Sequence, residues 1–201
     1  AEGRAVLLYH VERMNEESAN ALLKVMEEPP EGVLFLLTAD SLASVLPTIR
    51  SRCVSFAVAP VSPADCTRYC AAQGVDKKTA ALYSELFDGH IGTVLAVARD
   101  EARAAQVEKA LELARAAAAR DSYTAAVLLA AYEKDKAAAA ALLTDFRAVA
   151  AAGLRSSPRA PVQGTQARQA VRLADAALQR LGAQVNPKVV LTVFAAKLRT
   201  V

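Results

Sequence analysis

The chain has 201 residues, enough for one or two ordinary domains, and its formal net charge of +3 is too small to indicate nucleic-acid binding by itself. Hydrophobic residues make up 54% and charged residues 22%, a balance that excludes a disordered chain. Much of the hydrophobic content is alanine and aromatic residues reach only 5%, which favours closely packed helices. No run of about 18 uninterrupted apolar residues occurs, so we expect no membrane-spanning helix.

Residues 1–60 alternate between apolar runs and a helical pattern. The apolar runs predict strands at Ala5–Leu8, Val33–Leu37 and Val54–Val58, the first two buried on both faces. Asn15 can cap the helix between the first two strands, and Pro29 and Pro30 end it, because a residue before proline avoids the helical conformation. Strands separated by helical segments imply a parallel sheet, so this part is predicted to be α/β.

No convincing strand follows residue 60. Residues 61–100 predict three short helices, divided at Gly74 and Gly89, and residues 101–201 predict longer alanine-rich helices with one loop at Ser156–Gly164. The predicted fold class is therefore mixed α/β followed by all-α, with boundaries near residues 60 and 100.

The three cysteines, Cys53, Cys66 and Cys70, form no CxxC pair and indicate reduced thiols in a cytoplasmic protein. Cys66 and Cys70 can share a helix face, but no further ligand lies near them in the sequence, so we predict no metal site. The start of the chain, Ala1 to Arg4, does not have the pattern of a signal peptide.

Two segments carry a resemblance to a known family. The first runs from Asn15 to Pro30 and leads into a strand that ends at Thr38, and the second is Thr48-Ile49-Arg50-Ser51-Arg52-Cys53. Together they resemble the AAA+ clamp-loader subunits of bacterial DNA polymerase III. The resemblance is close from about Ala5 to Phe56 and rests mainly on topology over the final helices.

The resemblance implies the role of each part. Residues 1–60 correspond to the C-terminal half of an AAA+ nucleotide-binding domain with a partial parallel sheet, residues 61–100 to a helical lid, and residues 101–201 to a helical-bundle collar that oligomerises in a ring. The family's ring uses ATP to open a sliding clamp and close it on primed DNA during replication, as part of a DNA-directed DNA polymerase, a nucleotidyltransferase.

Positions that handle ATP in active family members are degenerate here. An acidic pair that serves Mg²⁺ and the attacking water is replaced by Tyr9 and His10, which cannot supply two carboxylates to a hard cation. A lid arginine is replaced by Thr93, and Thr38 is at best a weak γ-phosphate sensor. The resemblance therefore implies that this chain binds no cofactor or metal, and that ATP and Mg²⁺ belong to a neighbouring subunit.

Arg52, in the Ser51-Arg52-Cys53 motif, is retained. The resemblance implies an arginine finger that acts in trans, whereas the plainer interpretation is a solvated arginine beside a strand. The combination resembles the delta-prime type of subunit, a stator without ATPase activity whose partners are the gamma/tau and delta subunits and, through the assembly, the clamp and primed DNA. The alternatives are a gamma/tau ATPase subunit and a helical scaffold with a degenerate AAA+ remnant.

Two further features bear on the same region. Glu27 and Glu28 do not predict an acid–base pair, because adjacent helical residues point in different directions. The phosphate-binding pattern GxxxxGK[ST] is absent, and in the family it lies upstream of the segment corresponding to Ala1. We therefore expect a fragment in which residues 1–58 pack poorly alone or are completed by another chain.

Overall fold

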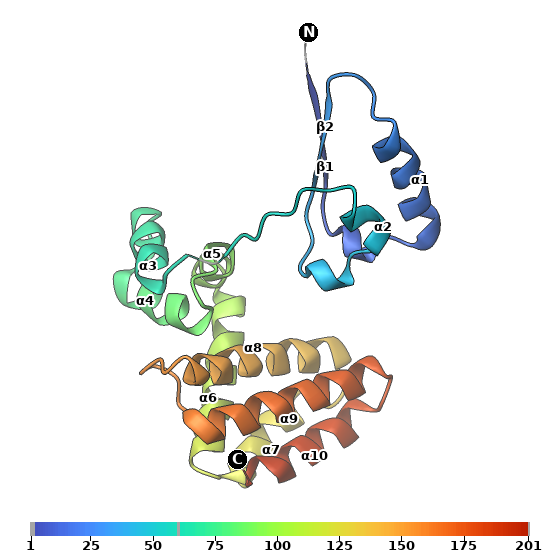
Figure 1. The fold of residues 1–201 in the computed structure, drawn as a ribbon. Coiled ribbons are helices and arrows are strands. Elements are labelled where there is room, and N and C mark those ends of the chain that lie inside the picture. The colour runs from blue at the N-terminus through green and yellow to red at the C-terminus, as the bar shows by residue number, and fades with distance from the viewer. Residues whose placement is uncertain (1–2, 60, 201) are drawn as a thin grey trace. The chain divides into compact units, whose positions relative to one another are not determined.

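The computed structural model describes residues 3–59 and 61–200 and divides into two compact units, residues 1–58 and residues 59–201 (Figure 1). The first unit contains a small sheet and the second is entirely helical over its described residues.

The sheet of the first unit consists of two strands, β1 (Arg4–Leu8) and β2 (Val33–Leu37). They pair in parallel, with Arg4 opposite Val33 and Leu8 opposite Leu37. The predicted parallel arrangement of the first two strands is therefore confirmed. Parallel pairing requires a crossover, which α1 (Glu16–Glu27) supplies beside the sheet (Figure 1).

Helix α1 begins where the sequence predicts. The Asn15 side chain accepts a hydrogen bond from the backbone N–H of Ser18, which satisfies one of the free donors of the first turn. Its buried residues, Ala19 and Leu22, share a core with Ile49. Three short helices complete the unit: η1 (Val11–Arg13), η2 (Leu42–Ser44) and α2 (Pro47–Arg50).

Two predictions for this unit are wrong. Residues 54–58 form no strand, and the side chains of Val54, Phe56 and Val58 are 83–94% exposed. An extended segment becomes a strand only when a neighbour supplies hydrogen-bond partners, and within the described ranges no strand lies along it. Contrary to the prediction, the first two strands are also not buried on both faces. Only one face of the sheet is covered, and on the other face Leu7, Leu34 and Leu36 are exposed.

The second unit is a stack of helices around one continuous apolar core that runs from Cys66 to Leu198. Its helices are α3 (Pro63–Ala72), α4 (Lys77–Leu86), α5 (Ile91–Arg99), α6 (Glu101–Ala118), α7 (Ser122–Ala130), α8 (Lys136–Leu154), α9 (Gly164–Gly182) and α10 (Pro187–Leu198). The predicted loop between α8 and α9 is present, and a new helix begins after Asp100, whose side chain caps α6.

The two helical parts predicted from the sequence, residues 61–100 and 101–201, share this core. Helix α4 packs against α8, and the loop after α8 binds the end of α4 through Arg159, which lies 3.0 Å from the carboxylate of Glu85. Arg155 also contacts Asp88 at 3.1 Å. The division at residue 100 stays a prediction.

Helix α8 is long and apolar enough to cross a membrane, judged by length and composition alone. Half of that stretch is buried inside the helical unit, where α8 packs against α6 and α9. Phe146 of α8 also meets Phe194 of α10 edge-on, with ring centroids 5.4 Å apart. This burial among other helices accounts for the apolar composition of α8.

One charged residue of α8 is buried. Asp145 is 3% exposed and accepts two hydrogen bonds from the guanidinium of Arg103 on α6, both at 2.5 Å. Gln106 adds a third at 2.8 Å. These bonds offset the cost of burying the carboxylate and fix α6 against α8.

We expect Asp145→Ala to destabilise the helical unit by about 2–3 kcal/mol, because Arg103 and Gln106 lose their buried partner and Arg103 is only partly able to reach water. Asp175→Ala is the matched control: it removes the exposed partner of Arg147, also between two helices, and should cost less than about 1 kcal/mol. Urea unfolding followed by circular dichroism measures both, and equal losses would contradict the prediction.

Candidate functional site

The carboxyl ends of β1 and β2 are tied together by backbone hydrogen bonds. The N–H of Thr38 donates to the carbonyl of Leu8 at 2.9 Å, and the N–H of Val11 donates to the carbonyl of Thr38 at 3.0 Å. Between them, the N–H of His10 donates to Oγ1 of Thr38 at 3.2 Å. This edge is where open parallel sheets commonly hold ligands.

His10 adopts a left-handed backbone conformation, with φ 56° and ψ 52°. A non-glycine residue pays a steric cost for that conformation, and the hydrogen bonds to Thr38 hold it there. The resulting turn directs the chain from β1 into η1 and brings the imidazole next to residues that follow β2.

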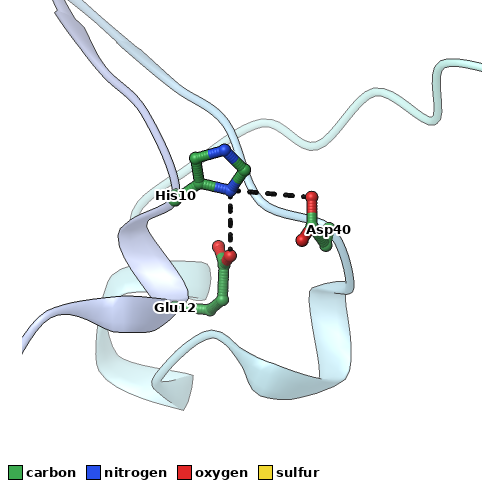
Figure 2. A group of neighbouring side chains, drawn as sticks. All are labelled: His10, Glu12 and Asp40. Carbon is green, nitrogen blue, oxygen red and sulfur yellow. Dashed lines mark hydrogen bonds and ion pairs between the residues drawn. The ribbon is translucent and has the colours of Figure 1, made fainter. Parts of the chain in front are cut away.

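Three side chains converge at this turn: His10, Glu12 and Asp40 (Figure 2). Nδ1 of His10 lies 3.2 Å from Oε1 of Glu12 and 3.6 Å from Oδ1 of Asp40. The Glu12 side chain is 11% exposed, and the nearby N–H of its own backbone, reinforced by His10, holds the pKa of this carboxyl below its ordinary value. The resemblance marks His10 only as a replaced acidic position, and no motif in the sequence points to Glu12 or Asp40.

Of the other positions that the resemblance marks as degenerate, Tyr9 and Thr38 follow the paired ends of β1 and β2, whereas Thr93 belongs to the second unit. Tyr9 is 69% exposed at the end of β1. The hydroxyl oxygen of Thr38 accepts a hydrogen bond from the backbone N–H of His10 and so helps to hold the turn after β1. Thr93 lies half-buried in the first turn of α5, in the second unit.

Arg52 lies in the turn that follows α2. Its backbone N–H donates to the carbonyl of Ile49 at 3.1 Å, and Ile49 is buried in the core of the unit, which fixes the turn. The Arg52 side chain is 37% exposed and forms an ion pair through Nη2 with Glu27. Its Nη1 donates to the carbonyl of Thr48 at 3.1 Å.

Glu27 is therefore more than the end of a helix. It is the last residue of α1 and contacts Arg52 across 25 positions of sequence. No periodicity or spacing links two residues so far apart, so the sequence gives no signal for this pair. The contact joins the two segments on which the family resemblance rests.

The cysteines are not part of the site. Cys66 and Cys70 are buried one turn apart on α3, and in the described parts of the chain neither belongs to a group of ligating side chains. Burial, and then the neighbouring Cys66, raise the pKa of the Cys70 thiol to about 11. Cys53, in the first unit, is partly exposed.

We expect thiol modification at about pH 8 to label Cys53 first and to leave Cys66 and Cys70 protected, because they are buried and the raised pKa leaves Cys70 about a hundredfold less thiolate than an ordinary cysteine. Mass spectrometry of the labelled chain gives the order. A Cys53→Ser chain should show no fast phase, and in denaturant all the cysteines should react. Equal native rates would contradict the prediction.

Comparison with known proteins gives matches concentrated in the first unit. Residues 1–62 match a family model described as "DNA polymerase III, delta subunit". A DNA polymerase III subunit delta' from Yersinia pestis is 44% identical over 66 residues, covering 33% of this chain and 19% of that protein. The subunit delta' from Haemophilus influenzae is 54% identical over 50 residues, covering 25% of this chain and 15% of that protein.

The matched segments therefore span only 19% and 15% of the length of these two relatives. A solved structure of a gamma subunit-related protein of DNA polymerase III from Thermotoga maritima resembles it over 98% of this chain and 72% of that one, with a TM-score of 0.55 and 22% sequence identity. This likeness is one of fold and extends over both units.

Proposed function

We propose that this chain, whose residues 1–62 match the DNA polymerase III family model and resemble delta-prime subunits, acts as the stator of the clamp loader and supplies Arg52 to the ATP site of a neighbouring subunit. Its partners would be the gamma/tau and delta subunits and, through them, the sliding clamp and primed DNA. The place of action would be the cytoplasm, during DNA replication.

The observation that carries this proposal is the placement of Arg52. The turn after α2 is anchored by buried Ile49, while the side chain of Arg52 is 37% exposed. A rigid base with an accessible tip suits a group that must reach a second molecule. The planar guanidinium can donate two hydrogen bonds to phosphate oxygens, which lysine cannot match in geometry.

The chain's own degenerate positions support a role in trans. Tyr9 and His10 stand where the family's active members carry an acidic pair, and neither residue has a carboxylate to offer Mg²⁺. Arg52 would therefore act on a nucleotide bound elsewhere. There it would stabilise charge on the oxygens of the transferred phosphoryl group, an effect worth roughly 10³–10⁵ in rate in systems where it has been measured.

The ion pair with Glu27 is compatible with this role. Both side chains are partly exposed, at 37% and 52%, and exposed ion pairs contribute only about 0–1 kcal/mol. Exchanging the Glu27 carboxylate for a phosphate oxygen therefore costs little. Until that exchange, Glu27 and the carbonyl of Thr48 limit the directions that the guanidinium can take.

We expect Arg52→Ala in the full-length subunit, assembled with gamma/tau, delta, clamp and primed DNA, to lower ATP turnover by roughly the share of one site, because a finger serves one neighbour. Arg52→Lys should not restore it. Assembly, followed by size-exclusion chromatography, should be unchanged.

Two further variants serve as controls. Glu27→Gln keeps the arginine and removes its ion-pair partner, so turnover should stay above that of Arg52→Ala. Arg13→Ala removes an exposed arginine from the same unit and should have no effect. Unchanged turnover in the assembled Arg52→Ala complex would refute the assignment of the finger.

The same preparation separates the alternatives. Tight ATP binding by the full-length protein would favour the gamma/tau type of subunit. Failure to associate with any clamp-loader subunit would favour a helical scaffold with a degenerate AAA+ remnant.

A further inference from the structure

We propose that His10, Glu12 and Asp40 bind a divalent transition-metal ion of the zinc type at the carboxyl edge of β1 and β2 (Figure 2). The proposal does not depend on Arg52 or on the role of the chain in a clamp loader. It concerns the edge at which the acidic pair for Mg²⁺ is lost.

The separations of the three ligand atoms suit such an ion. Bond lengths of about 2.0–2.2 Å to nitrogen and oxygen place two tetrahedral ligands about 3.4 Å apart. Nδ1 of His10 lies 3.2 Å from the Glu12 oxygen and 3.6 Å from the Asp40 oxygen, and the three ligand atoms all lie within 4.8 Å of one another. A small rotation of Asp40, whose side chain is 72% exposed, is enough to adjust the third ligand.

The carboxylate of Glu12 is only partly satisfied by its neighbours. One of its carboxylate oxygens, Oε1, contacts His10, while the other, Oε2, is buried and has no hydrogen-bond partner among the described residues. A buried carboxylate oxygen without a partner is costly, and an ion held by both oxygens of the Glu12 carboxylate would satisfy it. Arg13 lies 3.8 Å from Oε1 and is 73% exposed, so it offsets this charge only weakly.

The backbone holds two of the ligands in position before any ion arrives. The hydrogen bonds of His10 and Val11 to Thr38 fix the turn that carries His10 and Glu12. The same residue, Thr38, fixes the start of the segment that carries Asp40. The ligands thus come from both sides of a strand pairing, and binding an ion requires little ordering of the backbone.

The donor set selects the kind of metal. One imidazole nitrogen with two carboxylate oxygens suits Zn²⁺ and related ions. Mg²⁺ and Ca²⁺ prefer oxygen ligands alone. Three protein ligands leave a fourth position of a tetrahedral ion open to water or to a group from another molecule. The competing arrangement is a protonated His10 held by two carboxylates with no metal.

The test uses the whole chain, which contains only two histidines, His10 and His90. Zn²⁺ is added while the imidazole signals are followed by NMR. We expect one equivalent to shift the signals of His10 and to leave those of His90 unchanged. His90 is a built-in control, because its Nδ1 lies 2.7 Å from the carbonyl of Phe87 in the second unit. The titration is made in a Cys53→Ser chain, so that the partly exposed thiol does not compete.

Two variants remove ligands without removing the fold. Asp40→Asn changes an exposed side chain, and His10→Asn keeps a residue that tolerates the left-handed conformation. Each should weaken Zn²⁺ binding by about tenfold or more. Glu31→Gln, an exposed carboxylate outside the cluster, should bind as before.

Each opposite result overturns the proposal. Absence of Zn²⁺ binding, saturation without a shift of the His10 signals, or unchanged affinity in Asp40→Asn would leave the cluster as an ion pair only. Equal binding of Mg²⁺ would contradict the inferred donor preference. The Arg52 experiment is unaffected by any of these results.

Discussion

The in-register parallel pairing of β1 and β2 is the constraint on which the first unit depends. It aligns Leu8 with Leu37, so the residues that follow both strands meet at one edge. Thr38 then closes the edge through its N–H, its carbonyl and its hydroxyl. The crossover that parallel pairing demands is α1, which ends at Glu27, the residue that contacts Arg52. Both the Arg52 turn and the His10 cluster are consequences of this one pairing.

The local features of this unit could be predicted from the sequence. Apolar runs gave β1 and β2, and Asn15 with two prolines gave the limits of α1 to within a residue or so. The strand predicted at residues 54–58 is absent because their apolar alternation meets the side-chain requirement of a strand but not the backbone requirement. A strand needs hydrogen-bond partners on a neighbouring strand, and the sequence of one segment does not show whether such a neighbour is present.

The contacts within the candidate sites could not be predicted from the sequence, because they join residues that are far apart along the chain. Arg52 could be singled out by its motif, but its partner Glu27 is set by the tertiary fold. His10 could be identified as a departure from a family pattern, whereas Asp40 joins it only because two strands end at the same level. The helical unit shows the same division: the helix start after Asp100 is a local feature, while the buried ion pair of Asp145 with Arg103 joins residues far apart in the sequence.

The uncovered segment 54–58 has a consequence for the behaviour of the chain at high concentration. Val-Ser-Phe-Ala-Val carries no charge and no proline, combines β-branched and aromatic residues, and has its larger side chains almost fully in water. Its backbone donors and acceptors are also free of any strand within the described ranges. Such a stretch is a template for intermolecular strand pairing, so we expect residues 54–58 to promote self-association of this chain as its concentration rises.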